Sequence, residues 1–517
     1  MKRIKISAIN AFSGVVATIV EIIALLILKQ KFVAELGDSL YGLDQFVKNV
    51  VSAFSLAELG VGSVIGFSLY KPIARGDHGE IIALMQFYKR IYSKIGLSVL
   101  TLGILFMPFI LNFVKEYKSN LTLLYLTYLL FLLNSFLSYF FSYNKTLITS
   151  TQKSFVLNFN RIFYCIFSTF FLIFAITSTH NYIFYLAIWV IMQVCENLSC
   201  YIFAKKKYWY FFSKKEHKLS ADGKNKMNKN IKALVAHRVG GVLVLGSDGI
   251  IVPLISDLNV FGFFSNYVLI VSSVHKVLVQ IFDGIRASFG DFVARKEKTE
   301  AKKFFLILQT LAFIIYTWSS VFILNLCQPF VELWMGKGKQ LSFLSVILFV
   351  FNFYLRGLRL PIDLIKDVSG IYWQDRYKPI AESIVKIVFS LILSLYFGYI
   401  GVILGTTLSF VFVLFTVEPY IVYKYAFGQR VFSYYLEYLK YFIFFLIICL
   451  FSFLACRIFD SDQNLISLIS KKFAVSLLFP PLFFVVLLRK TYEFKFLKNT
   501  LKTCCSRTFE NLVKFFS

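Results

Sequence analysis

Long apolar runs alternate with short polar gaps along almost the whole chain. A helix needs about 20 apolar residues to cross a hydrocarbon core roughly 30 Å thick, because each residue adds about 1.5 Å. The pattern predicts an all-α integral membrane protein with about 14 transmembrane helices. We expect these helices at 6–28, 43–70, 92–114, 121–143, 155–177, 182–203, 233–255, 260–282, 304–327, 341–362, 380–398, 400–423, 438–456 and 473–488. The last run is the shortest, and its Pro480-Pro481 pair is expected to kink it.

Lysine and arginine gather in every second gap between these runs. With the N-terminus placed in the cytoplasm, the inside segments hold 41 basic residues, the outside gaps hold 9, and the spans hold the remaining 5 of 55. Ten of the inside lysines lie between Lys205 and Lys232. Cytoplasmic loops of membrane proteins are enriched in basic residues, so we expect a multi-pass protein with both termini in the cytoplasm.

Composition narrows the functional class. The chain is 58% hydrophobic, with a mean hydropathy of +0.70 and a net charge of +27. That charge follows the loop pattern, so no nucleic-acid partner is expected. The eight cysteines form no Cys-x-x-Cys pair, and the sequence has no Gly-x-x-x-x-Gly-Lys-Ser/Thr loop. Neither a metal cluster nor a catalytic triad is apparent, so we expect a protein without cofactor or metal that is not an enzyme.

The basic stretch divides the apolar runs into two sets. We expect a six-helix N-terminal lobe (1–203), a cytoplasmic basic inter-lobe loop (204–232), a six-helix C-terminal lobe (233–427), two additional transmembrane helices (428–488) and a basic cytoplasmic tail (489–517). The lobes echo one another, because Tyr41-Gly42-Leu43 and Phe261-Gly262-Phe263 each stand between an opening span and its successor. Two such lobes around a central cavity are typical of transporters that work by alternating access.

Charged residues inside predicted spans are the candidate functional residues, because a charge at a helix centre costs roughly 2.5–3.5 kcal/mol on the insertion scale. Lys48, Arg238 and Lys276 lie in helices that open the two lobes, and each shares a helical face with small or polar residues. We expect them to line the cavity as anion-binding groups. The alternatives are a local pair of Lys48 with Asp44, and a pair of Lys276 with Asp283 or snorkelling of its ammonium to the interface.

The other charges have two interpretations each. Arg356 and Arg359 share a face at the inner end of the tenth span, where they either line an inner vestibule or anchor the helix. Arg161 and Lys386 lie close to cytoplasmic ends and are expected to be interfacial anchors. The acids Glu21, Glu58 and Asp248 are candidates for coupling transport to H⁺ or Na⁺, and pairing with a nearby cation is the alternative for each.

Several stretches resemble the Wzx-type polysaccharide flippases of the MOP (MATE-like) superfamily. The likeness extends over about residues 1–427, and its motifs occur in order along the chain. The chain departs from many such relatives at Gly249, where they carry an asparagine. The matching stretches are Ser55 to Pro72, Tyr88 to Gly96, Ser247 to Val252, Phe261 to Tyr267, Asn352 to Tyr354, Asp375-Arg-Tyr-Lys-Pro379 and Gly401 to Thr407.

The resemblance implies a carrier in the bacterial plasma membrane. Such a protein would turn undecaprenyl-diphosphate-linked oligosaccharide from the inner to the outer leaflet, for capsule or related surface polysaccharide biosynthesis. Its partners would be that lipid-linked glycan, membrane lipids, H⁺ or Na⁺, and polysaccharide polymerase or other assembly proteins. The alternative is a cation-coupled drug or small-solute exporter of the MATE type. A membrane glycosyltransferase is a third reading, which the short outside gaps disfavour.

Overall fold

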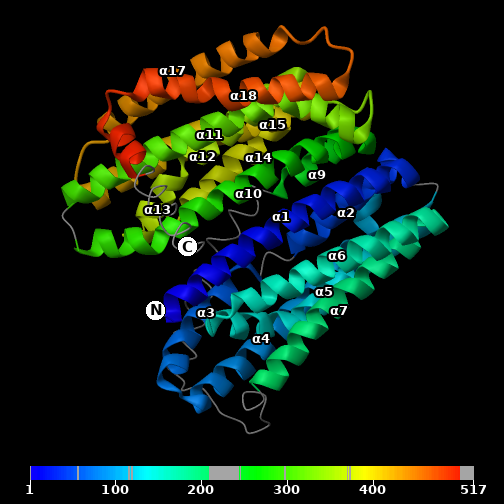
Figure 1. The fold of residues 1–517 in the computed structure, drawn as a ribbon. Coiled ribbons are helices and arrows are strands. Elements are labelled where there is room, and N and C mark those ends of the chain that lie inside the picture. The colour runs from blue at the N-terminus through cyan, green and yellow to red at the C-terminus, as the bar shows by residue number, and fades with distance from the viewer. Residues whose placement is uncertain are drawn as a thin grey trace, which may run out of the picture. The chain divides into compact units, whose positions relative to one another are not determined.

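A computed structural model gives the three-dimensional structure of the protein. It describes residues 2–500, except 55–57, 115–116, 118–119, 209–243, 245, 296–297, 370 and 372–373. The side chains at 2–8, 11, 58–61, 63–64, 67, 74, 112, 142 and 284–295 are likewise outside the description. Within the described residues, every regular element is a helix, as Figure 1 shows.

Twelve helices of the described chain are long and apolar enough to cross a membrane. They correspond to twelve of the fourteen expected spans, including the last, which begins earlier than expected at Leu465. The other two expected spans, 43–70 and 233–255, each include residues outside the described part of the chain. The first of them is represented by two shorter helices, α2 (Asp38–Phe54) and α3 (Glu58–Arg75), and the second by α9 (Asp248–Ile255).

The structure divides into two compact units. Unit 1 comprises residues 1–265 and 379–402. Its long helices lie side by side, with α1 against α6, α6 against α7, α7 against α5, and α5 against α4 (Figure 1). Besides α2, α3 and α9, it contains α1 (Lys2–Leu36), α4 (His78–Phe106), the 3₁₀ helix η2 (Met107–Asn112), α5 (Leu121–Ser150), α6 (Ser154–Thr179), α7 (Tyr182–Lys207), the start of α10 (Leu258–Arg295), nearly all of α14 (Lys378–Phe397) and the start of α15 (Tyr399–Ser409).

Unit 2 comprises residues 266–378 and 403–517. Its central helix is α11 (Lys298–Met335), which packs against α12, α13, α17 and α18. Because neighbours surround it, α11 is the most buried of the candidate spans in the described chain. The other elements are the rest of α10 and α15, α12 (Phe343–Leu358), α13 (Leu360–Val368), the π-helices η5 (Phe410–Leu414) and η6 (Val422–Phe427), α16 (Phe415–Ile421), α17 (Phe432–Arg457) and α18 (Leu465–Leu488).

The two Tyr/Phe-Gly motifs that echo one another meet in unit 1. A Cβ atom at Gly42 of α2 would lie 2.1 Å from the Leu258 carbonyl oxygen of α10. A Cβ atom at Gly262 would lie 3.3 Å from the Asp38 carbonyl oxygen. Each glycine thus faces the residue four positions before the other glycine. The first turns of α2 and α10 can approach this closely because both crossing points lack a side chain.

Prolines inside the helices of unit 2 leave carbonyl groups without their usual donor, and neighbouring helices supply one. Pro419 cannot donate to the Phe415 carbonyl, which instead accepts from the Tyr435 hydroxyl of α17 at 3.2 Å. In α18, Pro480 frees the Ser476 carbonyl, which accepts from the indole N–H of Trp318 at 3.0 Å. Lipid offers no donors, so these bonds let bent helices persist inside the bilayer.

Candidate functional site: charged side chains of the membrane-spanning helices

Lys48 and Lys276 are exposed lysines on apolar helices. Lys48 lies on α2, and no ion pair within 4.0 Å joins it to Asp44 one turn away. The Asp44 carboxylate instead accepts from the Tyr182 hydroxyl at 3.2 Å and from the side-chain amide of Gln45 at 3.0 Å. Lys48 and Asp44 therefore interact electrostatically without a direct contact, and the Lys48 ammonium remains able to contact another anion.

Lys276 lies on α10, C-terminal to the buried residues of the predicted polar stripe. Asn266 and Ser273 of that stripe are buried, at 1% and 8% exposure, whereas Lys276 is exposed. Among the described residues, no carboxylate lies within 4.0 Å of its ammonium, Asp283 included. The side chain of His275 next to it points into unit 2, where its Nδ1 bonds the Tyr316 hydroxyl at 2.9 Å. The helix thus presents Lys276 outward and keeps His275 in the core.

Two predicted site residues cannot be placed. Arg238 lies outside the described residues, as do Gly241 and Leu245 of the same predicted stripe. Glu58 begins α3, but its side chain is also outside the description. Their roles in anion binding and ion coupling stay predictions.

Glu21 and Arg161 form an ion pair between α1 and α6. The Arg161 guanidinium donates to the Glu21 carboxylate, and both side chains are partly exposed, at 43% and 27%. This is the pairing alternative considered for Glu21.

Asp248 and Lys386 form a second ion pair, between α9 and α14. The Lys386 ammonium lies 2.9 Å from Asp248 Oδ1, with only 2% of the lysine side chain exposed. It also donates to the Val244 carbonyl. The prediction that Lys386 is an interfacial anchor is wrong, because its side chain is buried and paired with Asp248. The periodicity of one helix could not reveal that α9 brings a carboxylate to this ammonium.

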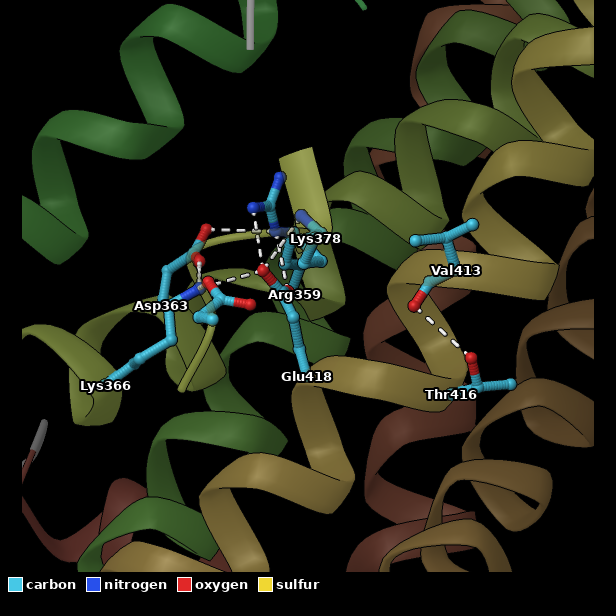
Figure 2. Close-up of polar contacts among 8 residues, drawn as sticks. Arg359, Asp363, Lys366, Lys378, Val413, Thr416 and Glu418 are labelled. Atoms are coloured by element: carbon cyan, nitrogen blue, oxygen red, sulfur yellow. Dashed lines mark hydrogen bonds and ion pairs between the residues drawn. The ribbon is translucent and has the colours of Figure 1, made fainter. Parts of the chain in front are cut away.

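The largest group of charges lies in unit 2, around Glu418 of α16. Figure 2 shows Arg359, Lys366 and Lys378 directed at its carboxylate. Arg359 donates to both carboxylate oxygens, at 2.8 and 2.9 Å, while the Lys366 and Lys378 ammonium groups lie at 2.9 and 3.0 Å. Asp363 and Asp375 complete the set: Lys366 lies 3.3 Å from Asp363 and 2.6 Å from Asp375, and Arg359 lies 3.2 Å from Asp363. We call these six residues the Glu418 cluster.

The Glu418 cluster is electrically balanced, with three cations and three carboxylates. Glu418 is fully buried, and Lys366, Lys378 and Asp375 are nearly so, whereas Arg359 and Asp363 remain 27% and 29% exposed. In the loop before α14, burial raises the pKa of the Asp375 carboxyl, and the Lys366 ammonium opposes that rise. Burying charges is tolerable only when they are paired and hydrogen-bonded, and this cluster meets that condition.

Arg359, one of the two arginines predicted to line an inner vestibule, belongs to the Glu418 cluster, and Arg356 precedes it by one turn. Arg359 is held by Glu418 and Asp363, so much of its charge is already compensated. Arg356 is half-buried one turn earlier on α12, and Asn352 of the same face donates to the Ile403 carbonyl at 3.2 Å. The Thr416 hydroxyl donates back to the Val413 carbonyl at 3.3 Å, within the helical segment that carries Glu418 (Figure 2).

Sequence reasoning missed most of this cluster and one buried lysine. The Asp375-Arg-Tyr-Lys-Pro379 motif contains two cluster residues, but nothing local shows that they meet Glu418. Lys29 was assigned to a gap because the first run was ended at 28, whereas α1 continues to Leu36. Its ammonium lies 4.7 Å from the Tyr41 ring centroid and donates to the Ser265 carbonyl at 3.5 Å. No glycine or proline stands between residue 28 and Gly37, and this was the signal for the longer helix.

Metal-ligating groups do not converge in the described residues, where no set of three His, Cys, Asp or Glu side chains could hold an ion. What these residues do offer is a contrast between cations. Arg161, Arg359, Lys366, Lys378 and Lys386 are paired with carboxylates, while Lys48 and Lys276 are exposed and unpaired. The ammonium groups of Lys48 and Lys276 can therefore bind an anion.

Comparison with solved structures shows which known fold the chain resembles. No family model matches the sequence, and no curated protein matches it. Among solved structures, the lipid II flippase MurJ in an inward closed conformation superposes with a TM-score of 0.64 at 16% identity, covering 92% of this chain and 98% of MurJ. An inward-facing multidrug resistance MATE transporter of the MOP superfamily gives 0.60 at 12% identity, covering 77% of this chain and 94% of the other.

A mutant of the Vibrio cholerae MATE transporter VcmN also gives a TM-score of 0.60, at 9% identity, covering 82% of this chain and 99% of VcmN. The protein therefore has the fold of MOP-superfamily transporters, which is that of a multi-pass integral membrane protein. At these identities the likeness shows the fold alone.

Proposed function

We propose that the protein is a transporter, not an enzyme, and that it flips lipid-linked oligosaccharide across the bacterial plasma membrane. The cargo is an undecaprenyl-diphosphate-linked glycan repeat unit, moved from the inner to the outer leaflet for capsule or other surface polysaccharide. The single observation that supports this most is that Lys48 and Lys276, on expected membrane-spanning helices, are exposed and form no ion pair with any described residue. They are groups that a diphosphate would need and that an organic cation would avoid.

The diphosphate is the physical obstacle to flipping. Moving an unpaired anion into hydrocarbon costs tens of kcal/mol by Born reasoning, so the carrier must supply cations and water along the path. Lys48, Lys276 and Arg238 would do so from the helices that open the two lobes, with Arg356 and Arg359 at an inner vestibule. The two lobes, 1–203 and 233–427, would expose the central cavity to each side in turn by alternating access.

Release of the cargo requires that the protein bind the diphosphate only weakly. Several cations of the described spans, among them Arg161, Lys366 and Lys386, are already paired with carboxylates and so do not hold the cargo with their full charge. An inside-negative membrane potential also favours outward movement of negative charge, by about 2.3 kcal/mol per charge per 100 mV. Glu21 and Glu58 are the carboxylates through which H⁺ or Na⁺ could be coupled in addition, while the Lys386 ammonium occupies the third candidate, Asp248. Both termini would face the cytoplasm, and a polysaccharide polymerase would receive the flipped product.

The second candidate is a cation-coupled drug exporter of the MATE type, which the shared fold favours. MATE structures cover 77% and 82% of this chain, whereas the lipid II flippase MurJ covers 92%. These likenesses reflect the shared fold and do not choose between the two cargoes. The exposed lysines favour a lipid-linked cargo, since a carrier of organic cations gains from acids and aromatic rings in its cavity.

Flipping by reconstituted protein tests the proposal. Proteoliposomes would carry a fluorescent undecaprenyl-diphosphate-linked oligosaccharide, and an impermeant quencher would report the outer-leaflet fraction over time. We expect Lys48→Gln and Lys276→Gln each to slow flipping about tenfold or more, since a charge-assisted contact contributes about 1.5–3 kcal/mol. Lys89→Gln, at an exposed lysine of α4, is the matched control and should leave the rate unchanged.

Two outcomes would contradict the proposal. One is wild-type flipping by the Lys48→Gln/Lys276→Gln double variant, which would exclude the cationic mechanism. The other is export of an organic-cation dye by the same proteoliposomes, with no movement of the lipid-linked glycan, which would favour the MATE-type alternative.

A further inference from the structure

The Lys386 ammonium has oxygen ligands of the kind that bind small cations. Within unit 1 it meets one carboxylate oxygen, Asp248 Oδ1 at 2.9 Å, and one main-chain carbonyl, that of Val244. Its side chain is 2% exposed. Carboxylate and main-chain carbonyl oxygens are the ligands that hard cations prefer in proteins. The lysine therefore delivers a positive point charge to a position that a free cation could also occupy.

The helix that carries Lys386 is polar along the same face. Lys378, Glu382, Lys386, Ser390 and Ser394 recur every four residues on α14, and all five are buried. Glu382 lies one turn before Lys386 and Ser390 one turn after it. The Ser390 hydroxyl donates to the Val402 carbonyl at 3.4 Å, which leaves its oxygen able to accept or coordinate. A polar stripe on a span helix is stable only where protein groups satisfy it, as they do here.

Asp248 begins the short helix α9, which contains Pro253, and Val244 lies four residues before it. Val244 and Gly246 are helical, and Ser247 is the single turn residue directly before α9. The carboxylate and the carbonyl thus come from one segment, four residues apart, and the positive charge comes from another helix.

We propose that Asp248 and the Val244 carbonyl form a monovalent-cation site that the chain fills with its own Lys386 ammonium, and that Na⁺ binds there when the ammonium is removed. In the intact protein the ammonium holds this position, so Na⁺ does not bind Asp248 there, although 24% of the Asp248 side chain is exposed. The coupling role predicted for Asp248 is then unavailable. The proposal concerns a binding site and does not depend on what the protein transports.

Thermal unfolding of the purified full-length protein in detergent tests it. Wild type, Lys386→Ala and Lys386→Met would be compared in NaCl, KCl and choline chloride at equal ionic strength. We expect both variants to unfold at lower temperature than wild type in choline chloride. Added Na⁺ should raise their unfolding temperature in a saturable way, while wild type responds equally to all three salts. Binding of one more equivalent of radioactive Na⁺ by Lys386→Ala than by wild type is the second expected result.

Two controls separate the site from a general salt effect. Lys386→Ala/Asp248→Asn lacks the carboxylate and should lose the Na⁺ response. Lys145→Ala removes a partly exposed lysine 3.5 Å from Glu196 and should gain no Na⁺ response. An equal response of Lys386→Ala to Na⁺ and choline would overturn the proposal, as would Na⁺ stabilisation of the double variant. Failure to recover either Lys386 variant folded in any of the salts would also overturn it, because Na⁺ would then not replace the ammonium.

Discussion

Gly42 and Gly262 pack against each other's helix in a reciprocal way. Gly42 faces Leu258, four residues before Gly262, and Gly262 faces Asp38, four residues before Gly42. Exchanging the two helices reproduces the same pair of contacts, which is the relation that a two-fold repeat produces. The spacing is unequal, however, since the two nearest carbonyl oxygens lie 2.1 Å and 3.3 Å from the ideal Cβ positions.

Because the two contact distances differ, we expect Gly42 and Gly262 to differ in how well they tolerate substitution by alanine. Gly42→Ala would drive a methyl group into the Leu258 backbone, and we expect destabilisation of about 1–3 kcal/mol, as for other overpacked sites. Gly262→Ala meets nothing closer than 3.3 Å and gains helix propensity of up to about 1 kcal/mol, so it should be neutral or stabilising. Thermal unfolding in detergent measures both. Equal loss of stability in the two variants would contradict the close α2–α10 crossing.

Removal of the Glu418 charge should be strongly destabilising. Glu418→Gln would leave three cations around a neutral side chain in a buried cluster, and breaking a buried pair costs about 3–5 kcal/mol. We expect poor recovery of folded protein and a clearly lower unfolding temperature. Glu300→Gln is the control, because the Glu300–Lys303 pair is exposed and should contribute at most about 1 kcal/mol.

A second variant distinguishes charge balance from simple loss of a contact. Glu418→Gln/Lys378→Met removes one negative and one positive charge together. It should recover part of the stability that Glu418→Gln loses, as judged by unfolding temperature. If the double variant were less stable than Glu418→Gln by the full cost of Lys378→Met alone, the three cations would not be acting on a common carboxylate.

The Tyr435 hydroxyl should contribute to stability through the carbonyl that Pro419 leaves free. Tyr435→Phe removes the donor to the Phe415 oxygen, and we expect a loss of about 1–3 kcal/mol because a membrane-embedded carbonyl finds no water. Tyr396→Phe, at a tyrosine that is 78% exposed, is the matched control and should change little. A double variant with Pro419→Ala tests the cause, since alanine restores a main-chain donor and should reduce the effect of Tyr435→Phe.

Trp318 should hold the C-terminal helix pair to α11. Trp318→Phe keeps an aromatic ring but removes the N–H that bonds the Ser476 carbonyl, so we expect a loss of about 1–3 kcal/mol. Trp189→Phe is the control, because that indole only packs on Phe131, at a centroid distance of 5.0 Å. Limited proteolysis after 457 would show whether α18 is released more readily. Equal effects of the two substitutions would mean that the hydrogen bond is not the relevant contact.

The hydrophobic periodicity predicted the helices well, but it did not predict which of their polar and charged side chains are buried or paired. The stripe containing Asn266 and Lys276 is real, but the pattern did not say that Asn266 is buried and Lys276 exposed. Lys386 looked like an anchor because Glu382 and a cytoplasmic end were its only visible neighbours in sequence. Its ion partner lies on α9, 138 positions before it. Charges in a membrane protein are decided by partners from other helices, which no single-helix pattern can contain.

The sequence by itself determined the class of the protein: long apolar runs of spanning length and alternate basic gaps leave no other solution in a bilayer. It also placed the charges on particular helices, since helical spacing is local. Only the tertiary structure decided which cations are neutralised by buried carboxylates and which stay exposed. The reason is that an ion pair forms over a few ångströms between helices distant in sequence, as Glu418 does with Arg359 and Lys366 and Asp248 does with Lys386.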